Sequence, residues 1–127
     1  MKKIFPKETI ADVYDHNIDD DIKYLHSDHD FLRSKTAMLI GNRINEYYDE
    51  YSKLLLHEMN EPIHFTHIRF GIKSAWTIAI ILAENLKPSD YSKLKAAFSQ
   101  WSEEEKQEIL QWLRNHPDHY RILSGTK

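Results

Sequence analysis

The chain has 127 residues, of which 41% are hydrophobic and 12% are aromatic, so it is long enough to bury one hydrophobic core. It has no cysteine, which excludes a disulfide scaffold, cysteine-ligated zinc and thiol catalysis. The net charge of −3 is unevenly distributed: residues 1–30 carry eight acidic and four basic side chains, and residues 31–127 carry twelve acidic and thirteen basic ones.

No repeat or change in composition divides the chain. We therefore expect a single domain over residues 1–127, with an acidic N-terminal segment (1–30) followed by a helical core (31–127). The most hydrophobic run, AWTIAIILA at residues 75–83, has about half the length needed to cross a bilayer, and no stretch resembles a signal peptide. These features predict a cytoplasmic protein.

The acidic segment contains the start of the first helix. Ile18, Ile22 and Leu25 have the i, i+4, i+7 spacing of one helical face, and Asn17 precedes them as a suitable N-cap. The aspartates at 19–21 would lie in the first turn, where carboxylates interact favourably with the helix dipole. Ser27 is in position to cap the next helix. Helix capping and the helix dipole therefore account for most acidic residues of this segment without a metal ion.

The middle of the chain predicts two longer helices. Apolar residues keep a helical period over residues 37–59, until Asn60 and Pro62 end it. Gly41 lies inside this pattern and indicates close helix packing or a kink. Residues 66–86 are apolar on nearly every side, which is typical of a central, buried helix.

The last third predicts two further helices and a short final turn. Ser89 is a suitable N-cap for one helix, and Ser102 with Glu105 forms a capping-box pattern for the next. Pro117 ends that helix. The predicted fold is therefore all-α: a compact single-domain bundle of about five helices with residues 66–86 at its centre.

Three tyrosines, Tyr47, Tyr48 and Tyr51, crowd a turn and a half of the second predicted helix. They cannot all point in one direction, so at least one ring should reach the surface or a groove. Tyrosine is enriched in protein interfaces because it offers a large contact area and a hydrogen bond. The cluster is either a partner-binding surface or a wide core face whose hydroxyl groups reach water.

Six of the eight histidines form three His-x-x-His pairs. Two imidazoles at i, i+3 on a helix project from the same side and can bind one metal ion. Glu61 and His64 also match half of the Glu-x-x-His signature of di-iron bundles, although Pro62 lies between them. A metal-binding protein, di-iron-like or hydrolytic, is thus an alternative hypothesis. Its candidate ligands are His26, His29, Glu61, His64, His67, His116 and His119.

Other patterns argue against catalysis and against nucleic-acid binding. The sequence has no Gly-rich phosphate loop, nucleophile elbow or HExxH motif. Residues 89–115 have roughly the lengths of a helix-turn-helix, but the second helix would begin with three glutamates, which phosphates repel. An oligomeric, DNA-associated factor therefore stays a further alternative only.

The leading hypothesis is a small non-enzymatic protein that binds a partner protein and needs no cofactor. Inhibitors, immunity proteins, antitoxins and phage accessory proteins are of this type, and the composition resembles that of small accessory proteins of bacterial mobile elements. An acidic surface would attract a basic partner, such as a toxin or nuclease, and the tyrosines would retain it. The candidate partner-binding residues are Asp15, Asp19, Asp20, Asp21, Asp28, Asp30, Tyr47, Tyr48 and Tyr51.

Overall fold

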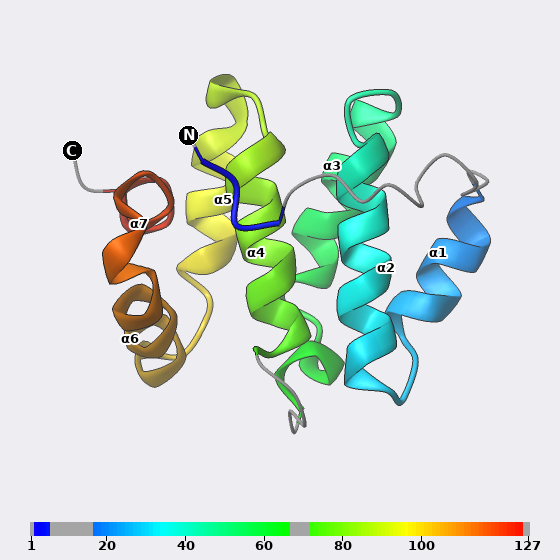
Figure 1. Ribbon diagram of the computed structural model, residues 1–127, viewed down its shortest axis with the longest axis horizontal. Coiled ribbons are helices and arrows are strands. Elements are labelled where there is room, and N and C mark those ends of the chain that lie inside the picture. The colour runs from blue at the N-terminus through cyan, green and yellow to red at the C-terminus, as the bar shows by residue number, and fades with distance from the viewer. Residues whose placement is uncertain (1, 6–16, 67–71, 126–127) are drawn as a thin grey trace.

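The computed structural model describes residues 2–5, 17–66 and 72–125, and this part of the chain contains helices and no strand (Figure 1). Two of the candidate residues, Asp15 and His67, lie outside it. The α-helices are α1 (Ile18–Leu25), α2 (Asp30–Arg43), α3 (Tyr48–Glu58), α4 (Ser74–Asn85), α5 (Tyr91–Phe98), α6 (Glu103–Trp112) and α7 (Pro117–Ser124). Three short 3₁₀ helices, η2 (Pro62–Phe65), η3 (Pro88–Asp90) and η4 (Leu113–Asn115), lie between them.

The predicted all-α fold is confirmed, but the part of the chain that the structure describes has seven α-helices instead of about five. The expected helix over residues 37–59 is divided into α2 and α3. The backbone N–H groups of Glu46 and Tyr47 both bind the carbonyl oxygen of Arg43, at 3.0 and 3.3 Å, and this ends α2 in a tight turn. No glycine or proline marks this turn. The expected final turn is also a full helix, α7.

Helix α4 is the centre of the bundle, as predicted. Every residue from Ser74 to Ala83 is buried, and α2, α3, α5 and α7 all pack against this helix (Figure 1). It begins at Ser74, later than the expected residue 66. None of the helices in the described segments is long and apolar enough to cross a membrane.

Gly41 on α2 lies close to Ile81 of α4. A Cβ atom at this position would lie 3.0 Å from Cγ2 of Ile81, which is closer than ordinary van der Waals contact between carbon atoms. The two helices run side by side in Figure 1. Of the two readings of Gly41, the structure therefore supports close helix packing.

Two predicted N-caps are confirmed and two are wrong. Ser89 lies inside η3, and the N-cap position of α5 is Asp90. The side chains of Asn17 and Ser102 accept hydrogen bonds from the backbone N–H groups of Asp20 and Glu105, each at 3.1 Å. Ser27, however, does not cap α2, because its Oγ accepts from the N–H of His29 within the preceding turn. The reciprocal half of the capping box is also missing, since the Glu105 carboxylate binds Lys73 and Trp76.

Helix α1 lies at one edge of the bundle and is connected to α3 by a buried hydrogen bond. The Tyr51 hydroxyl donates to Oδ2 of Asp21 at 2.6 Å, and the two residues are 0% and 1% exposed. Burial raises the pKa of Asp21, and the hydrogen bond from Tyr51 partly opposes this effect. Asp21 and Tyr51 are therefore part of the interior that holds α1 in place.

We predict that Tyr51→Phe lowers the free energy of unfolding by about 1–3 kcal/mol, because it leaves the buried Asp21 carboxyl without its donor. Urea denaturation measures the effect. Tyr24→Phe is the matched control, since the Tyr24 ring is 44% exposed and its substitution should change stability little. Equal effects of the two substitutions would contradict a structural role for the Asp21–Tyr51 bond.

Candidate functional site

The candidate aspartates are divided between the surface and the interior. Asp19 and Asp20 on α1 and Asp28 in the following turn are exposed, whereas Asp21 is buried. Asp30 is half-buried, and its Oδ1 accepts a hydrogen bond from the N–H of Phe31 at 2.8 Å, at the first turn of α2. The exposed acidic surface thus consists of Asp19, Asp20 and Asp28.

The tyrosine cluster is mainly internal. Tyr51 is fully buried, and Tyr47 packs edge-on against it with 5.9 Å between ring centroids. The Tyr48 hydroxyl donates to Asp90 Oδ2 at 2.7 Å and accepts from the N–H of Lys87 at 2.8 Å. The first of these bonds joins α3 to η3. Of the two readings given above, the structure places this cluster closer to a wide core face.

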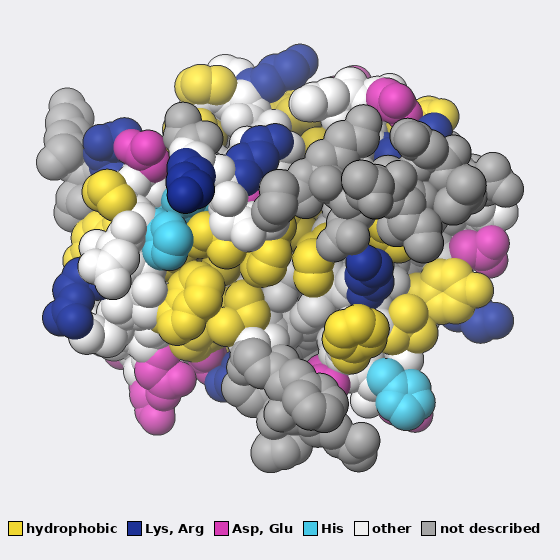
Figure 2. Space-filling view, in the orientation of Figure 1, with side chains coloured by type: hydrophobic (Ala, Val, Ile, Leu, Met, Phe, Trp, Pro, Cys, Tyr) yellow, Lys and Arg dark blue, Asp and Glu magenta, His cyan; other side chains and the backbone are white. Residues whose placement is uncertain are grey.

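Two other aromatic residues are exposed within the acidic segment. Tyr24 is 44% exposed and lies one turn after Asp20 on α1, and Phe31, at the start of α2, is 66% exposed. Figure 2 shows hydrophobic and acidic side chains next to one another over α1. We call Asp19, Asp20, Tyr24, Asp28 and Phe31 the acidic–aromatic surface.

A chain of polar side chains lies behind this surface, and all of them are buried except His26, whose side chain is 45% exposed. The Arg33 guanidinium, 2% exposed, donates from Nε to Ser74 Oγ at 3.0 Å, and Ser74 Oγ lies 2.9 Å from His64 Nδ1. His64 Nε2 lies 3.0 Å from Glu58 Oε1, and His26 Nε2 lies 2.7 Å from the same oxygen. We call these five residues the buried relay.

Glu58 fixes the direction of the hydrogen bond that it shares with His64. An ionised Glu58 can only accept, so His64 must donate from Nε2. On the other side of the ring, Ser74 Oγ accepts from Arg33 and lies 2.9 Å from His64 Nδ1. The Ser74 hydroxyl also has the carbonyl oxygen of His64 as an acceptor, at 3.5 Å. Every polar side chain of the relay therefore has a partner.

Ionisation of Glu58 is maintained by the same contacts. Burial, the largest single effect, raises the pKa of Glu58, but the hydrogen bond from His64 and the interactions with His26 together lower it below its ordinary value of 4.5. Arg33 has further acceptors in the Ser27 carbonyl oxygen at 2.7 Å and the Thr66 hydroxyl at 2.9 Å. The relay therefore connects α1, α2, α3, η2 and α4.

The order Ser74, His64, Glu58 is that of a hydrolytic triad, but the geometry does not suit catalysis. Ser74 and His64 are both 0% exposed, and the Ser74 oxygen already accepts from Arg33. A substrate carbonyl would need access to that oxygen. The arrangement is instead that of a satisfied polar core, which holds segments in register.

The structure separates Glu61 from His64 and His26 from His29, whereas it brings His26 and His64 together on one oxygen of Glu58. His64 turns inward to Glu58, whereas Glu61 forms an ion pair with His57 at 2.9 Å, so the Glu61–His64 pair is not brought together. The reason is that η2 begins at Pro62 and redirects the chain between the two residues. His29 is exposed at the N-cap of α2, away from its expected partner His26, which binds Glu58.

The third histidine pair stays together, with the rings of His116 and His119 edge to face at 5.7 Å between centroids, but the two side chains have different partners. His119 Nε2 lies 2.7 Å from Glu84 Oε2, and both side chains are buried, whereas the ring of His116 stacks on Trp112 with 6.0 Å between centroids. Glu84 Oε2 also accepts from the N–H of Ile4, so this contact fastens residues 2–5 to α4 and α7. The geometry favours a structural role for His119.

Sequence reasoning missed the polar residues of the core. Arg33 has the same helical phase as Ala37, Ile40 and Ile44, so its place on the buried face of α2 was visible in the spacing. Glu58 follows Leu55 by three residues and shares its face in the same way. Nothing in the sequence, however, indicates that these two side chains are joined through His64 and Ser74.

Comparisons with known proteins give no relationship from which to infer a function: no protein-family model matches the chain, and no curated protein and no solved structure matches it significantly. Function is therefore argued from the geometry alone.

We predict that Arg33→Lys lowers the free energy of unfolding by about 1–3 kcal/mol, because a single ammonium group cannot reach the three acceptors that the guanidinium serves. Chemical denaturation measures the loss. Arg114→Lys, at an exposed position near the C-terminal end of the chain, is the matched control and should change the free energy of unfolding little. A neutral Arg33→Lys would show that the buried relay does not need the guanidinium.

We predict that the stabilising effect of Glu58 is lost in acid. Since its folded-state pKa lies below 4.5, its contribution is complete above pH 4.5 and declines as the pH falls through the folded-state value. Urea denaturation of the wild type and of Glu58→Gln should therefore differ by about 1–3 kcal/mol at pH 7 and converge in acid. Because both proteins keep Asp21, its opposite pH dependence cancels. A difference that does not change with pH would contradict an ionised Glu58.

Proposed function

We propose that the protein is a small non-enzymatic regulator that binds a partner protein with a basic surface, through the acidic–aromatic surface of α1 and the start of α2. Proteins of the inhibitor, immunity-protein, antitoxin or phage-accessory type act in this way. The proposal keeps the exposed aspartates expected from the sequence and replaces the internal tyrosines by Tyr24 and Phe31.

The observation that carries this proposal is the exposure of Phe31. Its side chain is 66% exposed, more than any other large hydrophobic residue in the described part of the chain, and it follows Asp28 and Asp30 in the sequence. A phenylalanine gains free energy when it is removed from water, and an aromatic ring bordered by charges is typical of a binding hot spot with a polar rim. Tyr24 adds a second ring on α1.

The charge of the surface favours a basic partner. Asp19, Asp20 and Asp28 are exposed, and α1 carries Lys23 as its one exposed cation. Such a surface attracts a basic protein over several ångströms and repels phosphate backbones. We therefore expect charge to set the association rate and the aromatic rings to set the dissociation rate.

The surface is supported by rigid contacts. Helix α1 is held from behind by the Asp21–Tyr51 bond and by His26, which binds Glu58 at 2.7 Å. A surface that is ordered before binding loses less conformational entropy on association. This arrangement supports a docking role for α1, whereas Ser74, His64 and Glu58 of the relay are too deeply buried to meet a substrate.

The test compares two triple variants with the same change of charge. Asp19→Asn/Asp20→Asn/Asp28→Asn neutralises the proposed surface, and Glu103→Gln/Glu104→Gln/Glu108→Gln neutralises three exposed glutamates on α6. Proteins from the native host are captured on each variant and on the wild type, and those lost only with the first variant are identified by mass spectrometry. Their purified forms are then used for binding kinetics.

We predict that such a partner is basic, that its association rate falls about tenfold or more between low and physiological salt, and that Phe31→Ala accelerates its dissociation about tenfold or more. Trp112→Ala, which removes an aromatic ring 43% exposed on α6, is the control and should leave the kinetics unchanged. If both triple variants capture the same proteins as the wild type, the proposed surface is not the binding site.

A further inference from the structure

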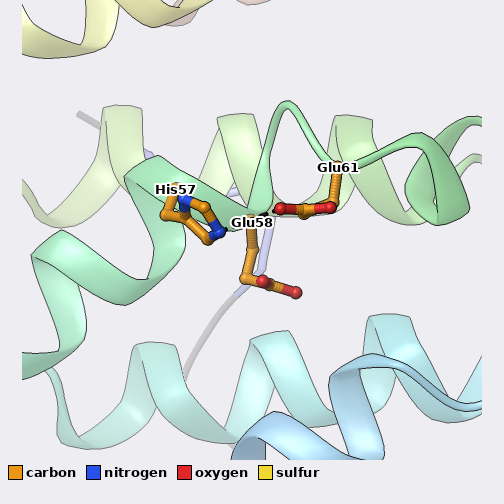
Figure 3. Close-up of side chains that lie close together, drawn as sticks. All are labelled: His57, Glu58 and Glu61. Atoms are coloured by element: carbon orange, nitrogen blue, oxygen red, sulfur yellow. Dashed lines mark ion pairs between the residues drawn. The ribbon is translucent and has the colours of Figure 1, made fainter.

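Three potential metal ligands meet at the C-terminal end of α3. One donor atom each from His57, Glu58 and Glu61 lies within 4.8 Å of the other two. Figure 3 shows the His57 imidazole and the Glu61 carboxylate pointing toward one another, with Glu58 beside them. This set is different from the His-x-x-His pairs expected from the sequence, because it comes from the last turn of α3 and the three residues after it.

One oxygen of the Glu58 carboxylate is not used by the buried relay. Both imidazoles that bind it, from His26 and His64, contact the same oxygen, Oε1. Oε2 has no hydrogen-bond donor in the described part of the chain, although the Glu58 side chain is only 2% exposed. A carboxylate oriented by outer imidazoles through one oxygen, with the other available, is a typical arrangement for a metal ligand.

The local charge also favours a cation. Glu58 and Glu61 together carry two negative charges, and the structure shows no lysine or arginine bound to either of them in the described segments. His57 and Glu61 are 71% and 36% exposed, so an ion can reach them from solvent. A divalent ion would balance the two carboxylates and use the imidazole as a neutral ligand.

We propose that His57 Nε2, Glu58 Oε2 and a Glu61 carboxylate oxygen form a binding site for a divalent metal ion of the zinc type. One imidazole and two carboxylates are ligands that Zn²⁺ accepts, and a water molecule would complete four-coordination on the exposed side. Alkaline-earth ions, which prefer six or more oxygen ligands, fit this set less well.

Binding an ion would need movement of the two surface ligands, because the three ligand atoms are held only within 4.8 Å of one another. Tetrahedral ligands at about 2.0–2.2 Å from zinc lie roughly 3.3–3.5 Å from one another. The present distance between His57 Nε2 and Glu61 Oε1 is 2.9 Å, so the two side chains would separate slightly as the ion enters between them. Both are on the surface and can change rotamer, whereas Glu58 is 2% exposed and stays fixed by His26 and His64. The ion would thus bind against one rigid and two adjustable ligands.

Calorimetric titration of the untagged protein with Zn²⁺ tests the site, with Mg²⁺ as a second titrant. We expect one Zn²⁺ per chain, about tenfold or more weaker binding in His57→Ala and in Glu61→Gln, and no comparable uptake of Mg²⁺. His29→Ala and Glu104→Gln, which change exposed residues outside the site, are matched controls and should bind as the wild type does. Because His57 and Glu61 are on the surface, both variants are expected to fold.

A second measurement identifies the ligands independently of affinity. On addition of Zn²⁺ the side-chain NMR signals of His57 should shift, whereas the bonds of His26 and His64 to Glu58 should persist. Zn²⁺ binding that survives both His57→Ala and Glu61→Gln, or that displaces His26 and His64 from Glu58, would overturn the proposal, as would the absence of stoichiometric binding. The result does not depend on the partner-binding proposal, because no partner protein is used.

Discussion

The structure depends on the need to satisfy two buried charges, those of Arg33 and Glu58. Neither side chain is more than 2% exposed, and an unpaired charge in such a place would cost several kcal/mol. They are not in direct contact but are connected through Ser74 and His64. Since these residues come from α2, α3, η2 and α4, the charges are satisfied only when all four segments are assembled.

The same constraint determines how α1 is presented. His26 at its C-terminal end shares the Glu58 oxygen with His64, and Asp21 in its first turn binds Tyr51. Helix α1 is thus fastened at both ends to the core, and its opposite side is left with the acidic–aromatic surface. In our proposal this surface binds a basic partner, and the metal ion would act on the same helix indirectly, through Glu58.

Local sequence patterns predicted the helices well and the site poorly, for a physical reason. Helical periodicity, caps such as Asn17 and Ser102, and the uniformly apolar α4 depend on neighbouring residues, so the sequence alone reveals them. The turn at Arg43 and the pairing of Glu58 with His26 and His64 depend on residues brought together by folding. The spacing of histidines suggested metal ligands, but burial assigned His64 and His119 to carboxylates of the core.

The most direct test of this account is the hydrogen on His64 Nε2, observed by nitrogen-15 NMR of the histidine side chains at neutral pH without metal. The relay predicts that Nε2 carries a proton, which it donates to Glu58. This proton should exchange slowly, because the ring is 0% exposed. An Nε2 without a proton, or one whose proton exchanges as fast as that of an exposed histidine, would contradict the relay.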